Sequence, residues 1–177
     1  MELKDMLQYR LAPQVPAHLQ DTAPTKAAIP PSPAEYLEAD FPEGKYWKRG
    51  QWVKYQKNCE ERGKGYKKLG FLTDADGDEI DDARLTTIMN TAQSLWSSLY
   101  MWREDPKTWS LRTMYACDFF SNTMRTKFEE FRLCKGDWKV HAFATVRYPD
   151  WSEDVHKQGK LSRISLSFLK YLFFNVY

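Results

Sequence analysis

The chain has 177 residues, 42% of them hydrophobic, and a formal net charge of +2, values that are typical of one globular domain with flanking segments. A total charge so close to zero indicates no particular nucleic-acid or membrane partner. The chain has three cysteines, an odd number, and it lacks both a secretory signal pattern and an 18-residue apolar run. These features predict free thiols, no transmembrane segment and an intracellular location, in the nucleus or the cytoplasm.

Residues 1–44 are predicted to form a disordered, proline-rich arm. Seven of the nine prolines lie between residues 12 and 42, and such a segment buries too little apolar surface to offset the entropy that it loses on ordering. Residues 29–33, IPPSP, resemble a polyproline ligand in composition only, because a spaced P-x-x-P motif with a flanking base is missing. A linker is therefore the favoured interpretation.

Residues 45–68 carry nine basic and two acidic side chains, with aromatic residues between them. We expect a short helix over residues 51–62, with Trp52, Tyr55 and Cys59 on one side. Cations release counterions from phosphates and flat rings stack on bases, so the segment is a candidate nucleic-acid surface and a candidate nuclear-import signal. The candidate nucleic-acid-binding residues are Lys48, Arg49, Trp52, Lys54, Tyr55, Lys57, Lys64, Lys67 and Lys68. The favoured alternative is a helix that packs Trp47 and Trp52 on the core and exposes its lysines.

Residues 74–82 contain six acidic side chains, but their spacing does not match a calcium loop. With Asp74 at the first ligand position, the sixth position needs glycine and holds Glu79, while the twelfth needs glutamate and holds Leu85. We expect instead an acidic turn that leads into the first core helix and pairs with the basic segment before it.

Three consecutive helices are predicted between residues 82 and 151, and the first has the clearest pattern. Its apolar residues recur at spacings of three and four, which places them on one face. These residues are Leu85, Ile88, Met89, Ala92, Leu95, Trp96, Leu99 and Trp102. Asp81 or Asp82 is expected to cap its start, and Pro106 is expected to end it.

The second core helix is expected to begin near Thr108 or Ser110 and to fray near Phe131. Its predicted inner face consists of Thr113, Cys117, Phe120, Met124, Phe128 and Phe131, whereas Arg112, Asp118, Arg125, Glu129 and Arg132 are assigned to the solvent side. The third helix is expected to be capped by Asp137 and to end at Tyr148, before Pro149. Its predicted inner face is Trp138, Ala142, Thr145 and Tyr148, with Val140, Phe143 and Val146 outside it and Trp151 closing the core.

Residues 159–177 form an apolar, basic tail for which several interpretations stay open. Ile164, Leu166 and Phe168 alternate with serines, a spacing that is typical of a strand. The tail could pack as an edge element, lie against a membrane or be the end of a truncated gene, and packing or truncation is favoured because the apolar residues are not clearly amphipathic at helical spacing.

The sequence offers no catalytic or metal-binding motif. The glycines lack the spacing of a phosphate-binding loop. Cys134 and His141 suggest a zinc site or a nucleophile with its base, but close C-x-x-C or H-x₃₋₅-H pairs are missing, and Cys117 on an apolar face is expected to be a core thiol. We therefore predict no metal, no cofactor and no enzymatic activity.

Residues 124–151 read MRTKFEEFRLCKGDWKVHAFATVRYPDW. A helix that ends in F-R-L-C, followed by W-K and then by A-T-x-x-Y-P-x-W, resembles a pattern in uncharacterised predicted proteins of mushroom-forming fungi. The matching residues are Phe131, Arg132, Leu133, Cys134, Trp138, Lys139, Ala144, Thr145, Tyr148, Pro149 and Trp151. The resemblance covers the helical core; it implies a lineage but no activity.

The sequence as a whole predicts a mainly α fold, a small bundle of three to four helices behind the proline-rich arm. The helical domain is expected over residues 45–158, with the basic aromatic segment at 45–70, the acidic turn at 74–82 and the core helices at 83–148. We expect a non-catalytic interaction module with an unidentified protein partner. The alternative is a nucleic-acid-binding domain that uses residues 45–68, or a helix-turn-helix variant with Lys135, Lys139 and Arg147 near its last helix. That helix carries few base-reading residues, which argues against sequence-specific recognition.

Overall fold

The computed structural model describes residues 25–174, and the side chains of residues 25–157. Its four α-helices are α1 (Arg49–Glu61), α2 (Asp82–Met101), α3 (Met114–Lys127) and α4 (Trp138–Phe174). A 3₁₀ turn at Glu38–Asp40 precedes α1, and two more, at Trp109–Leu111 and Glu129–Phe131, lie before and after α3. Within residues 25–174 the only extended pairing is a bridge between Thr73 and Glu79. The predicted mainly α fold is therefore confirmed.

Helix α2 is the central helix of the core and matches its prediction closely. Asp81 caps it, because its carboxylate accepts a hydrogen bond of 2.6 Å from the backbone N–H of Arg84, which satisfies a donor that the helix itself leaves free. The inner face is fully buried at four predicted positions, Ile88, Ala92, Trp96 and Leu99. The helix ends at Met101, before Pro106 is reached.

Aromatic rings from three helices meet at Trp96, which is fully buried. Its indole stacks on Phe120 of α3 at 5.4 Å and on Phe143 of α4 at 6.4 Å between ring centroids. Tyr148 meets it edge-on at 5.4 Å, and Trp151 covers it at 5.7 Å, as the sequence predicted for that residue. Large buried rings contribute about 0.5–1.5 kcal/mol per pair beyond their burial, so this cluster joins α2, α3 and α4.

Helix α3 begins later than predicted, at Met114, with Thr113 as its N-cap. The Thr113 hydroxyl accepts a hydrogen bond of 3.1 Å from the backbone N–H of Ala116, so Thr113 caps the helix and does not belong to its inner face. The assignment of Arg125 to the solvent side is also wrong, because this residue is only 5% exposed. Residues from the N-terminal part of the chain cover it, and a helical wheel does not include them.

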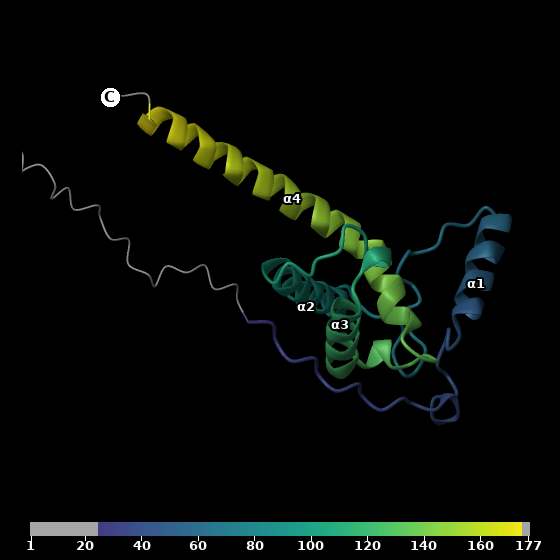
Figure 1. The fold of residues 1–177 in the computed structure, drawn as a ribbon. Helices are drawn as coiled ribbons and strands as arrows, with labels where there is room; N and C mark the ends of the chain where they lie inside the picture. The colour runs from purple at the N-terminus through teal and green to yellow at the C-terminus, as the bar shows by residue number, and fades with distance from the viewer. Residues whose placement is uncertain (1–24, 175–177) are drawn as a thin grey trace, which may run out of the picture.

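Helix α4 corrects three predictions. It continues through Pro149 to Phe174, instead of ending at Tyr148, and residues 164–168, which have a strand-like spacing, are helical. Pro149 lacks the N–H that would bond to the carbonyl of Thr145, but the helix on either side is long enough to persist. Its inner face also differs from the prediction, because Val140 and Phe143 are fully buried while Thr145 is exposed. Trp151 and His156 still contact α2, and the C-terminal part of the helix then extends away from the other three (Figure 1).

Within the part of the chain that the structure describes, no helix is both long enough and apolar enough to cross a membrane.

Residues 25–44, which the sequence assigns to a disordered arm, form an extended N-terminal strap along α3 (Figure 1). Side chains of α3 hydrogen-bond to strap carbonyls: the Tyr115 hydroxyl to Ala27 and the Asn122 amide to Pro30, both at 2.8 Å. Composition alone missed this order, because the stabilising contacts come from another part of the chain. The earlier part of the arm, residues 1–24, lies outside the described residues.

Gly77 lies in the acidic turn and packs against the end of the strap at Glu43. It has a φ of +81°, a left-handed conformation that favours glycine. A Cβ atom at this position would lie 2.2 Å from the carbonyl oxygen of Glu43. The turn therefore requires glycine for two separate reasons.

Replacing Gly77 with alanine is expected to lower the free energy of unfolding by at least about 1 kcal/mol, because the new methyl group would both clash and occupy an unfavourable backbone region. Urea denaturation measures this change. Gly65→Ala is the matched control: a Cβ atom there has no neighbour within 4 Å, so the expected change is within about 0.5 kcal/mol. Equal effects of the two substitutions would contradict this description of the turn.

Trp96→Ala is expected to lower the free energy of unfolding by about 3–5 kcal/mol, because it removes the ring that three helices share and leaves a cavity. Met114→Ala serves as the control, since Met114 is 81% exposed and its truncation removes little buried surface. Thermal or urea unfolding followed by circular dichroism compares the two. A loss for Trp96→Ala no larger than that for Met114→Ala would show that the cluster is not the centre of the core.

Candidate binding groove

The two tryptophans of the basic segment face inward. Trp47 and Trp52 are 4% and 5% exposed. The Trp52 ring packs edge-on against Phe71 at 5.5 Å and stacks on Tyr55 at 5.4 Å. The ring of Trp52 is therefore unable to stack on a nucleic-acid base, although Tyr55 stays 40% exposed.

Three of the candidate lysines are engaged by carboxylates of the same chain. Lys48 lies 3.8 Å from Glu38, Lys57 lies 3.8 Å from Glu61, and Lys67 lies 2.7 Å from Glu79. The last of these pairs is the expected contact between the basic segment and the acidic turn, and its hydrogen bond raises the pKa of Lys67. Exposed pairs of this kind add little stability, but they reduce the charge that is available to a phosphate backbone.

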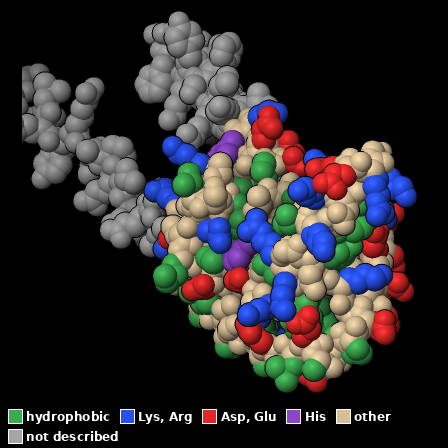
Figure 2. All heavy atoms as spheres, turned by 90° about the vertical axis from the view of Figure 1, so that its right-hand side faces the viewer, with side chains coloured by type: hydrophobic (Ala, Val, Ile, Leu, Met, Phe, Trp, Pro, Cys, Tyr) green, Lys and Arg blue, Asp and Glu red, His purple; other side chains and the backbone are tan. Residues whose placement is uncertain are grey.

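The remaining four cations, Arg49, Lys54, Lys64 and Lys68, form no ion pair with any residue that the structure describes. Figure 2 looks onto the side of the molecule that carries α1, and it shows Lys and Arg side chains spread over this face with hydrophobic side chains between them. The basic side chains of this face thus do not form one dense patch, because hydrophobic and acidic side chains lie among them.

A groove of ≈ 520 Å³ runs between α1 and α4 on this face. The groove is lined by apolar, basic and polar side chains and by one acidic residue; the apolar residues are Trp52, Val53, Phe71, Trp138, Ala142 and Val146. The cations are Arg49 from α1, Lys68 from the loop after it, and Arg112 from the loop before α3. The groove therefore combines an apolar floor with a cationic rim.

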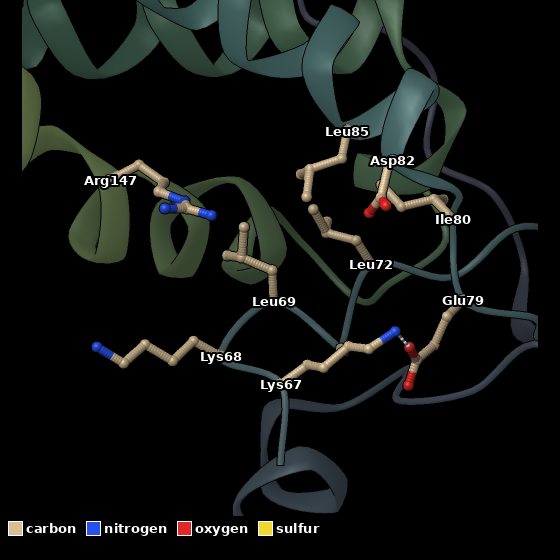
Figure 3. Close-up of a pocket in the computed structure, with 10 residues that line it drawn as sticks. Lys67, Lys68, Leu69, Leu72, Glu79, Ile80, Asp82, Leu85 and Arg147 are labelled. Carbon is tan, nitrogen blue, oxygen red and sulfur yellow. Dashed lines mark hydrogen bonds and ion pairs between the residues drawn. The ribbon is translucent and has the colours of Figure 1, made fainter.

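A second pocket, of ≈ 370 Å³, adjoins the groove and shares Lys68 with it. Leu69, Leu72 and Leu85 form its apolar base, and Arg147 reaches toward them from α4 (Figure 3). The Lys67–Glu79 ion pair lies along one edge, while Lys68 points away from the leucines. Lys68 thus lies between the groove and the second pocket, and each of them has an apolar base.

Two arginines on this face have buried donors. The Nε of Arg112 and the Nε of Arg147 have no hydrogen-bond partner among the described residues. Arg112 is held by its Nη1, which donates to the carbonyl of Trp109 at 2.9 Å, and its guanidinium lies 5.4 Å from the Trp109 ring. Sequence reasoning assigned Arg112 to the solvent side of a helix. Its position on the groove depends on the turn before α3, which no sequence signal identified.

Cys134 and His141, the pair that the sequence analysis considered as a nucleophile and its base, have separate partners in the structure. His141 does not pair with Cys134: its Nε2 lies 2.8 Å from Asp137 and 3.8 Å from the sulfur of Cys117. A nucleophile, base and orienting acid need the two imidazole nitrogens for different partners, whereas here one nitrogen contacts both and Nδ1 is buried without a described partner. The hydrogen bond from His141 lowers the pKa of Asp137. The geometry thus resembles a structural pair more than a catalytic triad.

Cys134 is only 2% exposed. Its thiol contacts the carbonyls of Phe131 at 3.5 Å and Gly136 at 3.4 Å, and burial raises its pKa. A buried neutral thiol is a poor nucleophile. Cys117 is half-buried.

The carboxylate of Asp74 stabilises the backbone of the acidic turn. Asp74 Oδ1 accepts hydrogen bonds from the backbone N–H groups of Asp76 at 3.1 Å and Asp78 at 2.9 Å. Among the side chains that the structure describes, no group of three or more His, Cys, Asp or Glu is placed to hold a metal ion.

Lys139 is fully buried in the first turn of α4. Its Nζ has no hydrogen-bond partner among the described residues, and burial lowers its pKa to about 8. The helix-turn-helix interpretation assigned this lysine to a DNA-contacting helix. That assignment is wrong, because the side chain does not reach the surface.

No protein-family model matches this chain, and neither a curated protein nor a solved structure shows a significant match to it. The function is therefore inferred from the geometry of the groove. The resemblance to the fungal pattern stays a prediction.

Lys139→Met is expected to stabilise the fold at pH 7 by about 3 kcal/mol, from a pKa difference of roughly two units at 1.36 kcal/mol each. The lysine has a pKa of about 10.4 in the unfolded chain and about 8 in the folded chain. At a pH between about 8 and about 10.4, this lysine is protonated in the unfolded chain and largely deprotonated in the folded chain. The free energy of unfolding of the wild-type chain should therefore rise with pH over this range. The substitution removes that rise.

Urea unfolding between pH 7 and pH 10 measures the slope, and the exposed neighbour Lys135 provides the control as Lys135→Met. The control should keep the wild-type slope. If the Lys139→Met chain showed the same pH dependence as the wild type, the pKa of Lys139 would not be lowered by burial in the folded chain.

Proposed function

We propose that this chain is a non-catalytic protein-interaction module, and that the groove between α1 and α4 binds a peptide segment of a partner protein. The segment would carry an apolar or aromatic side chain with carboxylates beside it. The observation that best supports this proposal is that one groove combines an apolar floor with the cations Arg49, Lys68 and Arg112.

The floor supports a peptide ligand because burial of apolar surface provides most of the binding free energy at such sites. Val53 is 52% exposed, and together with Trp138 and Val146 it provides apolar surface on the two helices that flank the groove. An aliphatic or aromatic side chain of the partner would cover this surface.

The rim supports an acidic partner. Arg49 and Lys68 make no ion pair with a described residue, and Arg112 retains a buried Nε without a described partner. Carboxylates placed between them would gain charge-assisted hydrogen bonds. Asp137 is the one acidic residue of the groove, and it is engaged by His141 at 2.8 Å, so it opposes an anionic ligand less than a free carboxylate would.

Nucleic acid is the less favoured partner. Stacking platforms need open ring faces, and Trp52 is buried. Three of the seven candidate cations are engaged by carboxylates of the same chain, which lowers the number of phosphates that the segment neutralises.

Selection of a random-peptide phage library on the full chain tests the proposal. We expect enrichment of sequences that place Asp or Glu beside Leu, Phe or Trp. Lys68→Glu combined with Arg49→Glu should weaken the selected peptides by about tenfold or more, because both changes put negative charge on the rim. The matched control is Lys54→Glu, which reverses a charge on α1 outside the groove.

Three outcomes would contradict the proposal. The library could yield no enriched peptide, the control could weaken binding as much as the double substitution, or single-stranded oligonucleotides could bind more tightly than any selected peptide. Oligonucleotide affinity that fell steeply with salt would identify a nucleic-acid module instead.

A further inference from the structure

The N-terminal strap contacts α3 and the following loop through a row of side chains. Beyond the contacts from Tyr115 and Asn122, Arg132 donates to the carbonyl of Ala34 at 2.9 Å and stacks its guanidinium over the ring of Tyr36 at 3.7 Å. Between these fixed points lies Ser32, an exposed residue of the strap. The chain at this point reads IPPSP.

Arg125 is the α3 side chain that faces Ser32, and its hydrogen-bonding capacity is largely unused. The residue is only 5% exposed. Its Nη1 makes one long contact of 3.4 Å to the Ser32 hydroxyl, while its Nε and Nη2 are buried without a hydrogen-bond partner among the described residues. Glu35, at 4.0 Å from Nη2, lies beyond hydrogen-bond distance. A buried guanidinium with two free donors is costly unless an anion satisfies it.

We infer that Ser32 is a phosphorylation site, and that Arg125 binds the phosphate and thereby fastens the strap to α3. Arginine presents its N–H groups in a planar fork that matches phosphate oxygens. The existing contact brings the fork to the oxygen that would carry the phosphate. A phosphate also adds three strong acceptors to a position where two donors lack any.

The residue after Ser32 indicates the class of kinase. Ser32–Pro33 is the one Ser-Pro or Thr-Pro dipeptide in the 177 residues, and proline-directed kinases select this pair. The Ser32 oxygen would attack the γ-phosphorus of ATP, so an O–P bond forms while the bond to the β–γ bridging oxygen breaks. ADP leaves, and the hydroxyl proton passes to the catalytic aspartate of the kinase.

The proposal does not depend on the peptide groove, since the strap lies on α3 and the groove lies between α1 and α4. In the unmodified chain the strap is held by hydrogen bonds that Tyr115, Asn122 and Arg132 donate to its carbonyls, and by ion pairs of Lys26 and Glu35. Such contacts open readily. The phosphate would convert the centre of the strap into its most strongly held point.

The first experiment incubates the full chain with ATP and a proline-directed kinase and follows phosphate incorporation by mass spectrometry. We expect one phosphate on the wild-type chain and none on Ser32→Ala. A chain that stays unmodified, or a phosphate that persists in Ser32→Ala, would overturn the assignment of the site.

The second experiment compares the phosphorylated and unmodified chains by hydrogen–deuterium exchange and ³¹P NMR. We expect exchange over residues 27–36 to slow by about fivefold or more on phosphorylation. We also expect the second pKa of the phosphoserine to lie below its ordinary value of about 6. Arg125→Gln should abolish both effects while Ser32 is still phosphorylated.

The ³¹P titration of the wild-type chain remains decisive if Arg125→Gln does not fold. An ordinary phosphoserine pKa together with unchanged or faster exchange of the strap would show that the phosphate stays in solvent, and would overturn the role of Arg125.

Discussion

Trp96 lies where α2, α3 and α4 meet, and the packing of rings against its indole holds these three helices together. Phe120 and Phe143 stack on it, and Tyr148 meets it edge-on. Tyr148 then connects the core to the surface, because its hydroxyl donates to the carbonyl of Pro106 at 2.6 Å. That bond fixes the loop that follows α2, and the same loop leads to the turn that places Arg112 on the groove.

The groove is a secondary consequence of that core. The carbonyl of Trp47 accepts two hydrogen bonds, one of 2.9 Å from the backbone N–H of Lys135 and one of 3.1 Å from the indole N–H of Trp138. These bonds hold the start of α1 beside the start of α4, while Trp52 packs on Phe71 underneath. The two helices are thus held side by side at one end, and the surface between them stays open and partly apolar. A candidate binding surface of this kind is formed by the fold and carries no short sequence motif.

Sequence patterns predicted the fold class and the inner face of α2, since periodic burial along one helix depends on neighbouring residues only. They failed where distant residues decide the outcome. Arg125 looked exposed on a helical wheel but lies beneath the strap, and α4 passes through Pro149 although proline disfavours helix interiors. For the candidate site, Arg49, Lys68 and Trp52 belonged to a segment that the sequence singled out, whereas Arg112, Val146 and Trp138 reach the groove through tertiary packing alone.

The central claim, that the groove between α1 and α4 binds a protein partner, is tested most directly by a two-dimensional ¹H–¹⁵N NMR titration. The full chain would be titrated with an acidic peptide that carries one aromatic residue, and separately with a single-stranded oligonucleotide. Binding in the groove predicts that the peptide shifts the indole signal of Trp138 and the amides of Val53 and Val146, while Lys64 stays unchanged. Shifts confined to Lys54, Tyr55 and Lys64, or shifts produced by the oligonucleotide alone, would contradict it.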